Sequence, residues 1–190
     1  MGLIAVVCAG LSILQYQWTG DVSRAERARL RSGLDEQVAL LVRTFDDEIS
    51  DSCRALMPDP SEIRAEGVQE ANGSHYQEWA SSHERGLFER IGVAVPEHGT
   101  LRLYGFDGEG RMTPMKWPAN WDTLRVTMAA RMRGEGPPPS APRDSTLIEA
   151  PVFDDGEGRD GPRAELEWLI FELSEDHLRS KTLPRLWRSF

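Results

Sequence analysis

Cysteine and basic side chains are scarce in this 190-residue chain. Two cysteines are too few for a disulfide-stapled scaffold or a four-cysteine zinc site. Lysine and arginine number 22 against 31 acidic residues, and the net charge of −9 argues against a nucleic-acid-binding module. With 17 glycines and 12 prolines the chain is neither collagen-like nor of low complexity, and 39% hydrophobic residues suffice for a core.

Motifs that carry catalysis or bind cofactors are also missing from the sequence. There is no H-E-x-x-H, paired-cysteine, G-x-S-x-G, phosphate-loop or dinucleotide-binding pattern. The acidic segment Asp154–Gly158 does not place its carboxylates at the alternating positions of a calcium loop. We therefore assign no catalytic, cofactor-binding or metal-binding residue, and a small membrane-tethered enzyme is the least favoured class.

The first part of the chain is apolar, reading GLIAVVCAGLSIL over residues 2–14. This run is shorter than the roughly 20 residues of a full membrane helix, so a buried helix or a signal peptide are alternatives. No basic residue precedes the run and no A-x-A-like cleavage site closes it, whereas Tyr16 and Trp18 are typical of a membrane interface. We expect residues 1–18 to be a partial transmembrane helix that contacts lipid and whose first turns precede this chain. The expected membrane-spanning residues are Leu3, Ile4, Val6, Val7, Leu11, Ile13 and Leu14, with Tyr16 and Trp18 at the interface.

Residues 19–57 are predicted to form a long, membrane-proximal helix. Apolar residues recur every three or four positions and form one stripe: Leu30, Leu34, Val38, Leu41, Phe45, Ile49, Cys53 and Leu56. Pro58 and Pro60 end the pattern. The stripe predicts either packing against the chain's own domain or pairing with a second copy in a homodimer, and both can hold at different heights. Both cysteines, Cys8 in the apolar run and Cys53 on this stripe, read as small buried hydrophobes.

The remaining residues, 58–190, alternate between helical and strand patterns. Helices are expected at 74–90 and 121–133, and strands near 91–95, 101–104, 111–116, 147–153 and 165–173. Ser174 is a good helix N-cap, and Pro184 should kink or split the helix that follows. These patterns predict an α+β fold, with a mostly antiparallel sheet and flanking helices.

The segment that follows the apolar run, Leu14-Gln15-Tyr16-Gln17-Trp18-Thr19-Gly20-Asp21-Val22-Ser23-Arg24-Ala25-Glu26-Arg27, is more specific. It resembles the segment by which a group of bacterial two-component sensor histidine kinases leaves the first membrane helix and enters the extracytoplasmic sensor. Further matches follow in order at residues 76–79, 103–106, 168–173 and 183–190.

The resemblance implies that this chain is the signal-input region of such a kinase, with a PAS-like sensor domain that continues beyond residue 190 and without the kinase's catalytic half. It also implies the bacterial inner membrane, with residues after Trp18 outside the cytoplasm. Arg24, Arg27, Arg29 and Arg31 would by themselves place that flank in the cytoplasm. The alternative function is a stand-alone, single-pass anchored binding or scaffolding protein. A small-molecule ligand is not identified by the sequence; the aromatic residues available to contact one on the sheet face and its covering loops are Tyr104, Trp117 and Trp121, and core packing is the alternative use of each.

Overall fold

The computed structural model describes residues 31–135, 146–154 and 165–188. The chain divides into two compact units: residues 1–46 with 186–190, and residues 47–185. The expected membrane-spanning and interface residues, from Leu3 to Trp18, lie outside the described residues. Within the described part of the chain, no helix combines the length and apolarity needed to cross a membrane.

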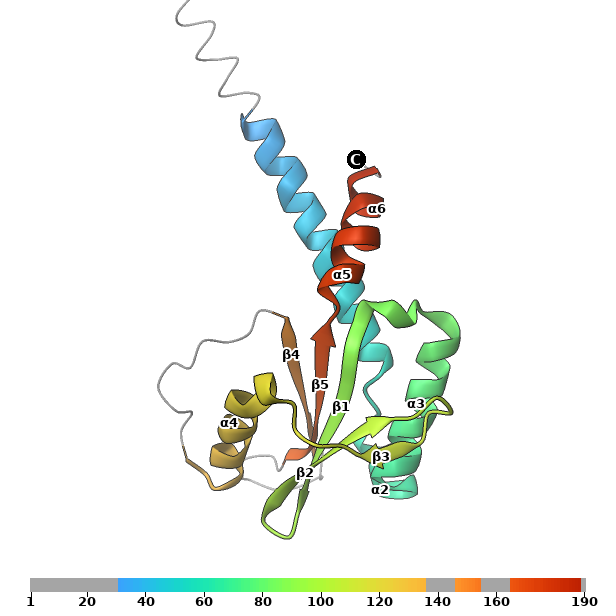
Figure 1. Cartoon of the computed structure of the whole chain (residues 1–190), viewed down its shortest axis with the longest axis vertical. Coiled ribbons are helices and arrows are strands. Elements are labelled where there is room, and N and C mark those ends of the chain that lie inside the picture. Colours follow the sequence, from blue (N-terminus) through green and yellow to red (C-terminus); the bar gives the residue numbers. More distant parts are fainter. Residues whose placement is uncertain (1–30, 136–145, 155–164, 189–190) are drawn as a thin grey trace, which may run out of the picture. The chain divides into compact units, whose positions relative to one another are not determined.

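The larger unit is built on a five-stranded antiparallel sheet (Figure 1). Its strand order is β3-β2-β1-β5-β4, so the first and last strands are neighbours at the centre. The strands are β1 (Phe88–Glu97), β2 (Thr100–Phe106), β3 (Met112–Pro114), β4 (Leu147–Phe153) and β5 (Glu165–Leu173). Together with its flanking helices, this sheet confirms the predicted α+β class.

A tight turn joins β1 to β2 and fixes their register. His98 and Gly99 both have positive φ, 50° and 78°, as required by the two-residue turns that match strand twist. Glu97 then pairs with Thr100, and Val93 pairs with Tyr104. Because side chains alternate along a strand, this register sends Val93, Val95 and Tyr104 to one face of the sheet and Ala94 and Leu103 to the other.

One face of the sheet is covered by α4 (Asp122–Met132), which follows the short 3-10 helix η2 (Ala119–Trp121). The buried cluster on this face comprises Ala94, Leu103, Trp121, Met128, Trp168 and Ile170. A β-carbon added at Gly92 would approach the ring of Trp121 to 2.8 Å. The glycine therefore lets this indole lie directly against β1.

The opposite face is covered by α2 (Pro60–Glu66) and α3 (Val68–Ser82), as Figure 1 shows. Trp79 of α3 packs against Phe88, and Phe88 against Phe171 of β5, with ring centroids 5.7 and 5.2 Å apart. Here one prediction is wrong: the helix expected at 74–90 begins earlier and ends at Ser82. Phe88 starts β1 after a 3-10 turn, η1 (Arg85–Leu87), because its ring completes the sheet's core instead of a helix face.

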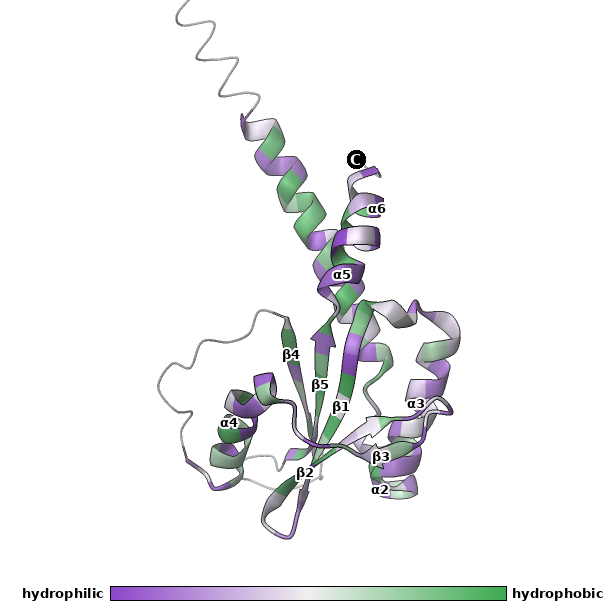
Figure 2. Cartoon of the chain, viewed as in Figure 1, coloured by the Kyte–Doolittle hydropathy of each residue, from purple (hydrophilic) through white to green (hydrophobic). Residues whose placement is uncertain are grey.

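A helix occupies residues 31–55, within the long helix predicted over 19–57. Figure 2 shows hydrophobic and hydrophilic residues interspersed along it. The apolar stripe divides along its length: Ile49, Cys53 and Leu56 are buried, whereas Leu34 and Val38 remain 59% and 49% exposed. The late part of the stripe thus packs in the core of the larger unit, as one of the two interpretations requires.

Directly after β5 the chain forms α5 (Glu175–His177), the π-helical turn η3 (Leu178–Thr182) and α6 (Leu183–Arg188). Ser174 caps α5 by accepting a hydrogen bond from the backbone N–H of His177 at 3.3 Å, as predicted. The π turn comes immediately before Pro184. A proline lacks the N–H needed for an α-helical bond, which explains why the helix is divided where the sequence predicted.

Candidate functional site

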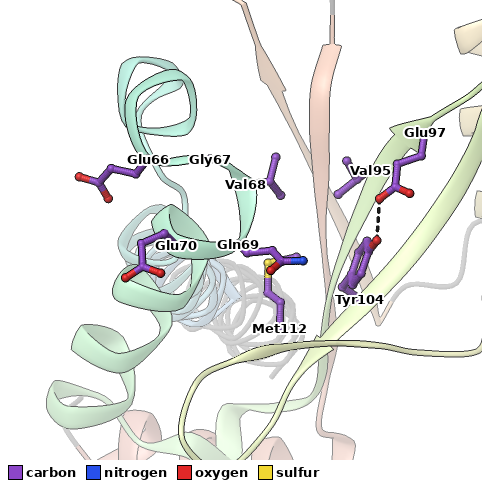
Figure 3. Close-up of a pocket in the computed structure, with 9 residues that line it drawn as sticks. All are labelled: Glu66, Gly67, Val68, Gln69, Glu70, Val95, Glu97, Tyr104 and Met112. Atoms are coloured by element: carbon purple, nitrogen blue, oxygen red, sulfur yellow. Dashed lines mark hydrogen bonds between the residues drawn. The ribbon is translucent and has the colours of Figure 1, made fainter.

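A cavity of about 440 Å³ lies where the α2–α3 junction faces the sheet (Figure 3). One wall comes from the end of α2 and the first turn of α3, and the other from β1, β2 and β3. The lining residues are Glu66, Gly67, Val68, Gln69, Glu70, Val95, Glu97, Tyr104 and Met112. Its size is within the range of small-molecule sites.

Local sequence signals position the helical wall. Asp59 accepts the backbone N–H of Ser61, and Glu62 accepts the backbone N–H of Asp59 at 2.8 Å, which forms a capping box at the start of α2. Pro60 occupies the first helical position, where its missing N–H has no cost. Gly67 then ends α2 and begins α3 with φ 91° and ψ 158°, a conformation open almost only to glycine.

On the sheet wall, Tyr104 and Glu97 form a short hydrogen bond. The Tyr104 hydroxyl donates to Oε1 of Glu97 at 2.6 Å, the dashed contact in Figure 3, and Nε of Arg102 pairs with Oε2 of Glu97 at 3.1 Å. The hydrogen bond to this carboxylate raises the pKa of Tyr104, with burial adding to the effect. The phenol therefore stays protonated at neutral pH and serves as a donor to Glu97.

The helical wall presents carboxylates of a different kind. Glu66 and Glu70 are exposed, and neither forms a salt bridge with any of the residues that the structure describes. No side chain caps the start of α3, so the backbone N–H groups of its first turn lie at this wall without a side-chain acceptor. Figure 3 shows the carboxylates of both glutamates pointing away from Tyr104, so they lie at the outer side of the helical wall, and the carboxylate beside the aromatic ring is that of Glu97. Carboxylate acceptors near an aromatic ring are suited to a small molecule with N–H donors.

A glutamate of the sheet is fully buried beneath α3, where it contacts a residue one turn after the start of that helix. Glu167 of β5 is 0% exposed, and the Nδ2 of Asn72 donates to both its carboxylate oxygens at 3.0 Å. Burial raises the pKa of Glu167 to about 7, against the opposing effect of the Asn72 hydrogen bond. The same Nδ2 reaches the Val68 carbonyl at 2.9 Å, whereas Oδ1 of Asn72 is buried without a hydrogen-bond partner among the residues that the structure describes.

The aromatic residues that the sequence offered as ligand contacts do not come together. Tyr104 lines the cavity, whereas Trp121 is 0% exposed in the core under α4, and Trp117 packs against that same core. The sheet separates them, because register places Tyr104 on the face opposite Leu103. Of the three, only Tyr104 belongs to the candidate site.

Sequence reasoning missed the residues that build this site: Glu66, Gln69, Glu70, Asn72, Glu97 and Glu167. Two signals were available. The Asp59-Pro60-Ser61-Glu62 run is a capping box with proline at the first helical position and marks α2. Glu167 is the one charged residue between Leu166 and Phe171, and a charged residue within such an apolar run is either at an edge or buried with a partner.

Reactive chemistry has little support in the described ranges. Burial raises the pKa of the Cys53 thiol to about 12, which keeps it in the unreactive thiol form. Across residues 31–135, 146–154 and 165–188, no group of three or more His, Cys, Asp or Glu side chains is placed to hold a metal ion.

Comparison with protein-family models, with curated proteins and with solved structures finds no match to this chain.

Proposed function

We propose that this chain is the extracytoplasmic signal-input region of a membrane-bound bacterial sensor histidine kinase, with a PAS-like sensor domain and no kinase catalytic residues of its own. The exit segment around Trp18 motivates the proposal, and one structural observation carries it. The start of β1 lies beside the end of β5, and Ser174 donates its N–H to the Leu87 carbonyl at 3.0 Å. A shift of these central strands would therefore act directly on the helices that follow residue 174.

A chimera tests this function. The chain is joined through a membrane helix to the catalytic half of a sensor histidine kinase, and autophosphorylation is measured in vesicles. We expect the kinase rate to change when substitutions perturb the β1–β5 pair, and to stay constant when exposed residues of α4 such as Val126 are changed. An autophosphorylation rate that stays the same with both sets of substitutions would favour the stand-alone anchored binding or scaffolding protein.

Membrane topology is the second part of the proposal. Residues 2–14 would lie in the lipid and Tyr16 and Trp18 at its surface, with everything after Trp18 outside the cytoplasm of a bacterial cell. Alkaline phosphatase fused after Phe190 should be active, and green fluorescent protein at the same position should be dark. The opposite pair of results would overturn the topology.

A homodimer through the N-terminal helix is the third part. Leu34 and Val38 expose apolar surface on successive turns, within the unit that also holds the 68% exposed Trp187. An apolar stripe at this spacing is the seam that a second copy of the helix would cover. Single cysteines at Leu34 or Val38, in a chain with Cys8 and Cys53 replaced by serine, should crosslink between copies. Cysteine at Glu36, off the stripe, is the matched control and should crosslink weakly.

The acceptor-rich cavity is the proposed place for a ligand. The carboxylate of Glu97 beside the ring of Tyr104, together with Glu66 and Glu70 on the outer side of the helical wall, favours a small molecule with positively charged N–H groups. Calorimetric titration with putrescine, arginine and, as the negative probe, succinate tests this preference. Glu70→Gln should weaken binding of the cationic probes, whereas Glu78→Gln, further along α3, should leave it unchanged.

A further inference from the structure

A second cluster of side chains lies on another side of α3, around His75. It borders an open cavity of about 630 Å³ formed by the end of the N-terminal helix, the segment after it, α2 and α3. His75 is 25% exposed. Its ring contacts two elements at once, one through each nitrogen.

Both ring nitrogens of His75 face hydrogen-bond acceptors. Nδ1 lies 3.2 Å from the backbone carbonyl oxygen of Ala55, and Nε2 lies 2.9 Å from Oε2 of Glu62. A carbonyl and a carboxylate oxygen can only accept, so both contacts are hydrogen bonds only when both nitrogens carry protons. Neutral imidazole carries one proton, and one of the two contacts would then set a lone pair against a lone pair. The geometry is therefore that of the imidazolium ion.

The groups that the ring contacts carry negative charge or partial negative charge. Ala55 is the last residue of the N-terminal helix, where backbone carbonyls lack helical partners and a cation is favoured. The hydrogen bond from the backbone N–H of Asp59, followed by that from His75, lowers the pKa of Glu62. Hydrogen bonds from Ser61 likewise lower the pKa of Asp59. Both carboxylates thus remain ionised in the range where histidine titrates.

The other charged or titratable groups near the ring do not have the titration range of a histidine. On the N-terminal helix, Arg54 pairs with Asp51 at 2.8 Å, and the buried Cys53 thiol stays protonated. On α3 itself, Glu78 is exposed one turn beyond His75. Among these groups, histidine is the type of side chain whose charge changes between about pH 5 and 8.

We propose that His75 is a proton-operated clasp, which as imidazolium fastens the end of the N-terminal helix and the start of α2 to α3, and which loses one of the two attachments when it is deprotonated. Residues 66–70, which line the candidate ligand cavity, continue directly from α2 into α3. The clasp therefore connects that cavity's helical wall to the end of the N-terminal helix, and acidification is the stimulus to which it responds. Its role in signalling rests on the proposed function; the clasp itself does not.

Hydrogen–deuterium exchange on the full chain in nonionic detergent tests the clasp. Wild type and His75→Gln are compared at the same pH, so that the intrinsic exchange chemistry cancels. At about pH 5.5 the backbone amides of residues 53–63 should exchange about tenfold faster in the variant, because a hydrogen bond to a charged group is lost. At about pH 8 the two proteins should differ by less than about twofold, since wild type has then lost the same attachment.

Three further measurements separate the possible outcomes. His75→Arg, which stays charged, should keep the slow exchange at both pH values. His83→Gln is the matched control, because His83 is exposed near the other end of α3 and its Nδ1 lies 2.8 Å from a neutral partner, the Ser82 hydroxyl. If the His75 variants do not fold, titration of wild type followed by NMR decides, since the His75 ring signal and the Ala55 and Met57 amides should shift with one midpoint.

Equal exchange of wild type and His75→Gln at about pH 5.5, or separate midpoints in the titration, would overturn the clasp whatever the chimera shows. If the autophosphorylation rate of the chimera does not change with pH while the exchange difference is present, the clasp stands and its signalling role is refuted.

Discussion

Replacing Glu167 by glutamine should make the protein more stable at alkaline pH and leave it almost unchanged in acid. The carboxyl group is fully buried, and its pKa rises from 4.5 to about 7 on folding. A raised pKa in the folded state means that the stability is fully present below about pH 4.5 and is lost as the pH rises through about 7. Above that range the folded protein must hold a buried charge that the unfolded chain leaves in water.

The size of the effect follows from this shift. Between about pH 5 and about pH 8 the shift should cost wild type roughly 2 to 3 kcal/mol of unfolding free energy. The introduced amide has nearly the same shape, and its carbonyl oxygen can still accept from Nδ2 of Asn72. Because it does not ionise, Glu167→Gln should exceed wild type in stability by roughly this amount at about pH 8.

Urea unfolding of the full chain in nonionic detergent, followed by the fluorescence of the buried Trp79, Trp121 and Trp168, measures both proteins at several pH values. The difference between variant and wild type isolates Glu167 from other titrating groups. Glu70→Gln, which removes an exposed carboxylate from α3, should show no such gap. A difference that stays flat with pH, or a variant that is less stable at about pH 8, would mean that the Asn72 hydrogen bond outweighs burial and would refute the reasoning.

Three other substitutions test the fold that holds the site. Gly67→Ala should destabilise the protein by about 1 to 3 kcal/mol in urea unfolding, because φ 91° with ψ 158° is strained for alanine. Gly108→Ala is the control and should change the stability little, since a β-carbon there meets no atom within 4 Å. Gly92→Ala should cost about 1 to 3 kcal/mol and change the fluorescence of Trp121, whose ring its β-carbon would approach to 2.8 Å; unchanged stability would show that the ring moves freely aside. Ser174→Ala should cost about 1 kcal/mol through loss of the α5 cap, and replacement by aspartate should restore most of it.

Regular patterns in the sequence were sufficient for the elements whose side chains face one environment along their whole length. The strands at 147–153 and 165–173 occur with the predicted bounds, and α4 matches the predicted helix within a residue at each end. The helix expected at 74–90 failed at both ends. Its early part was hidden because Asn72 and Gly73 are buried without being apolar, and hydrophobic periodicity cannot register such positions.

The sequence alone determined the α+β class, the order of most helices and strands, the N-cap at Ser174, and an apolar stripe along the N-terminal helix, because these depend on interactions between residues a few positions apart. Only the tertiary structure decided that the stripe is buried at Ile49 and exposed at Leu34, and that Tyr104 lines a cavity. It also brought Asn72 to Glu167, 95 positions away, and His75 to the carbonyl of Ala55. Such contacts depend on strand order and helix placement, and the burial they create is what shifts the protonation of Glu167.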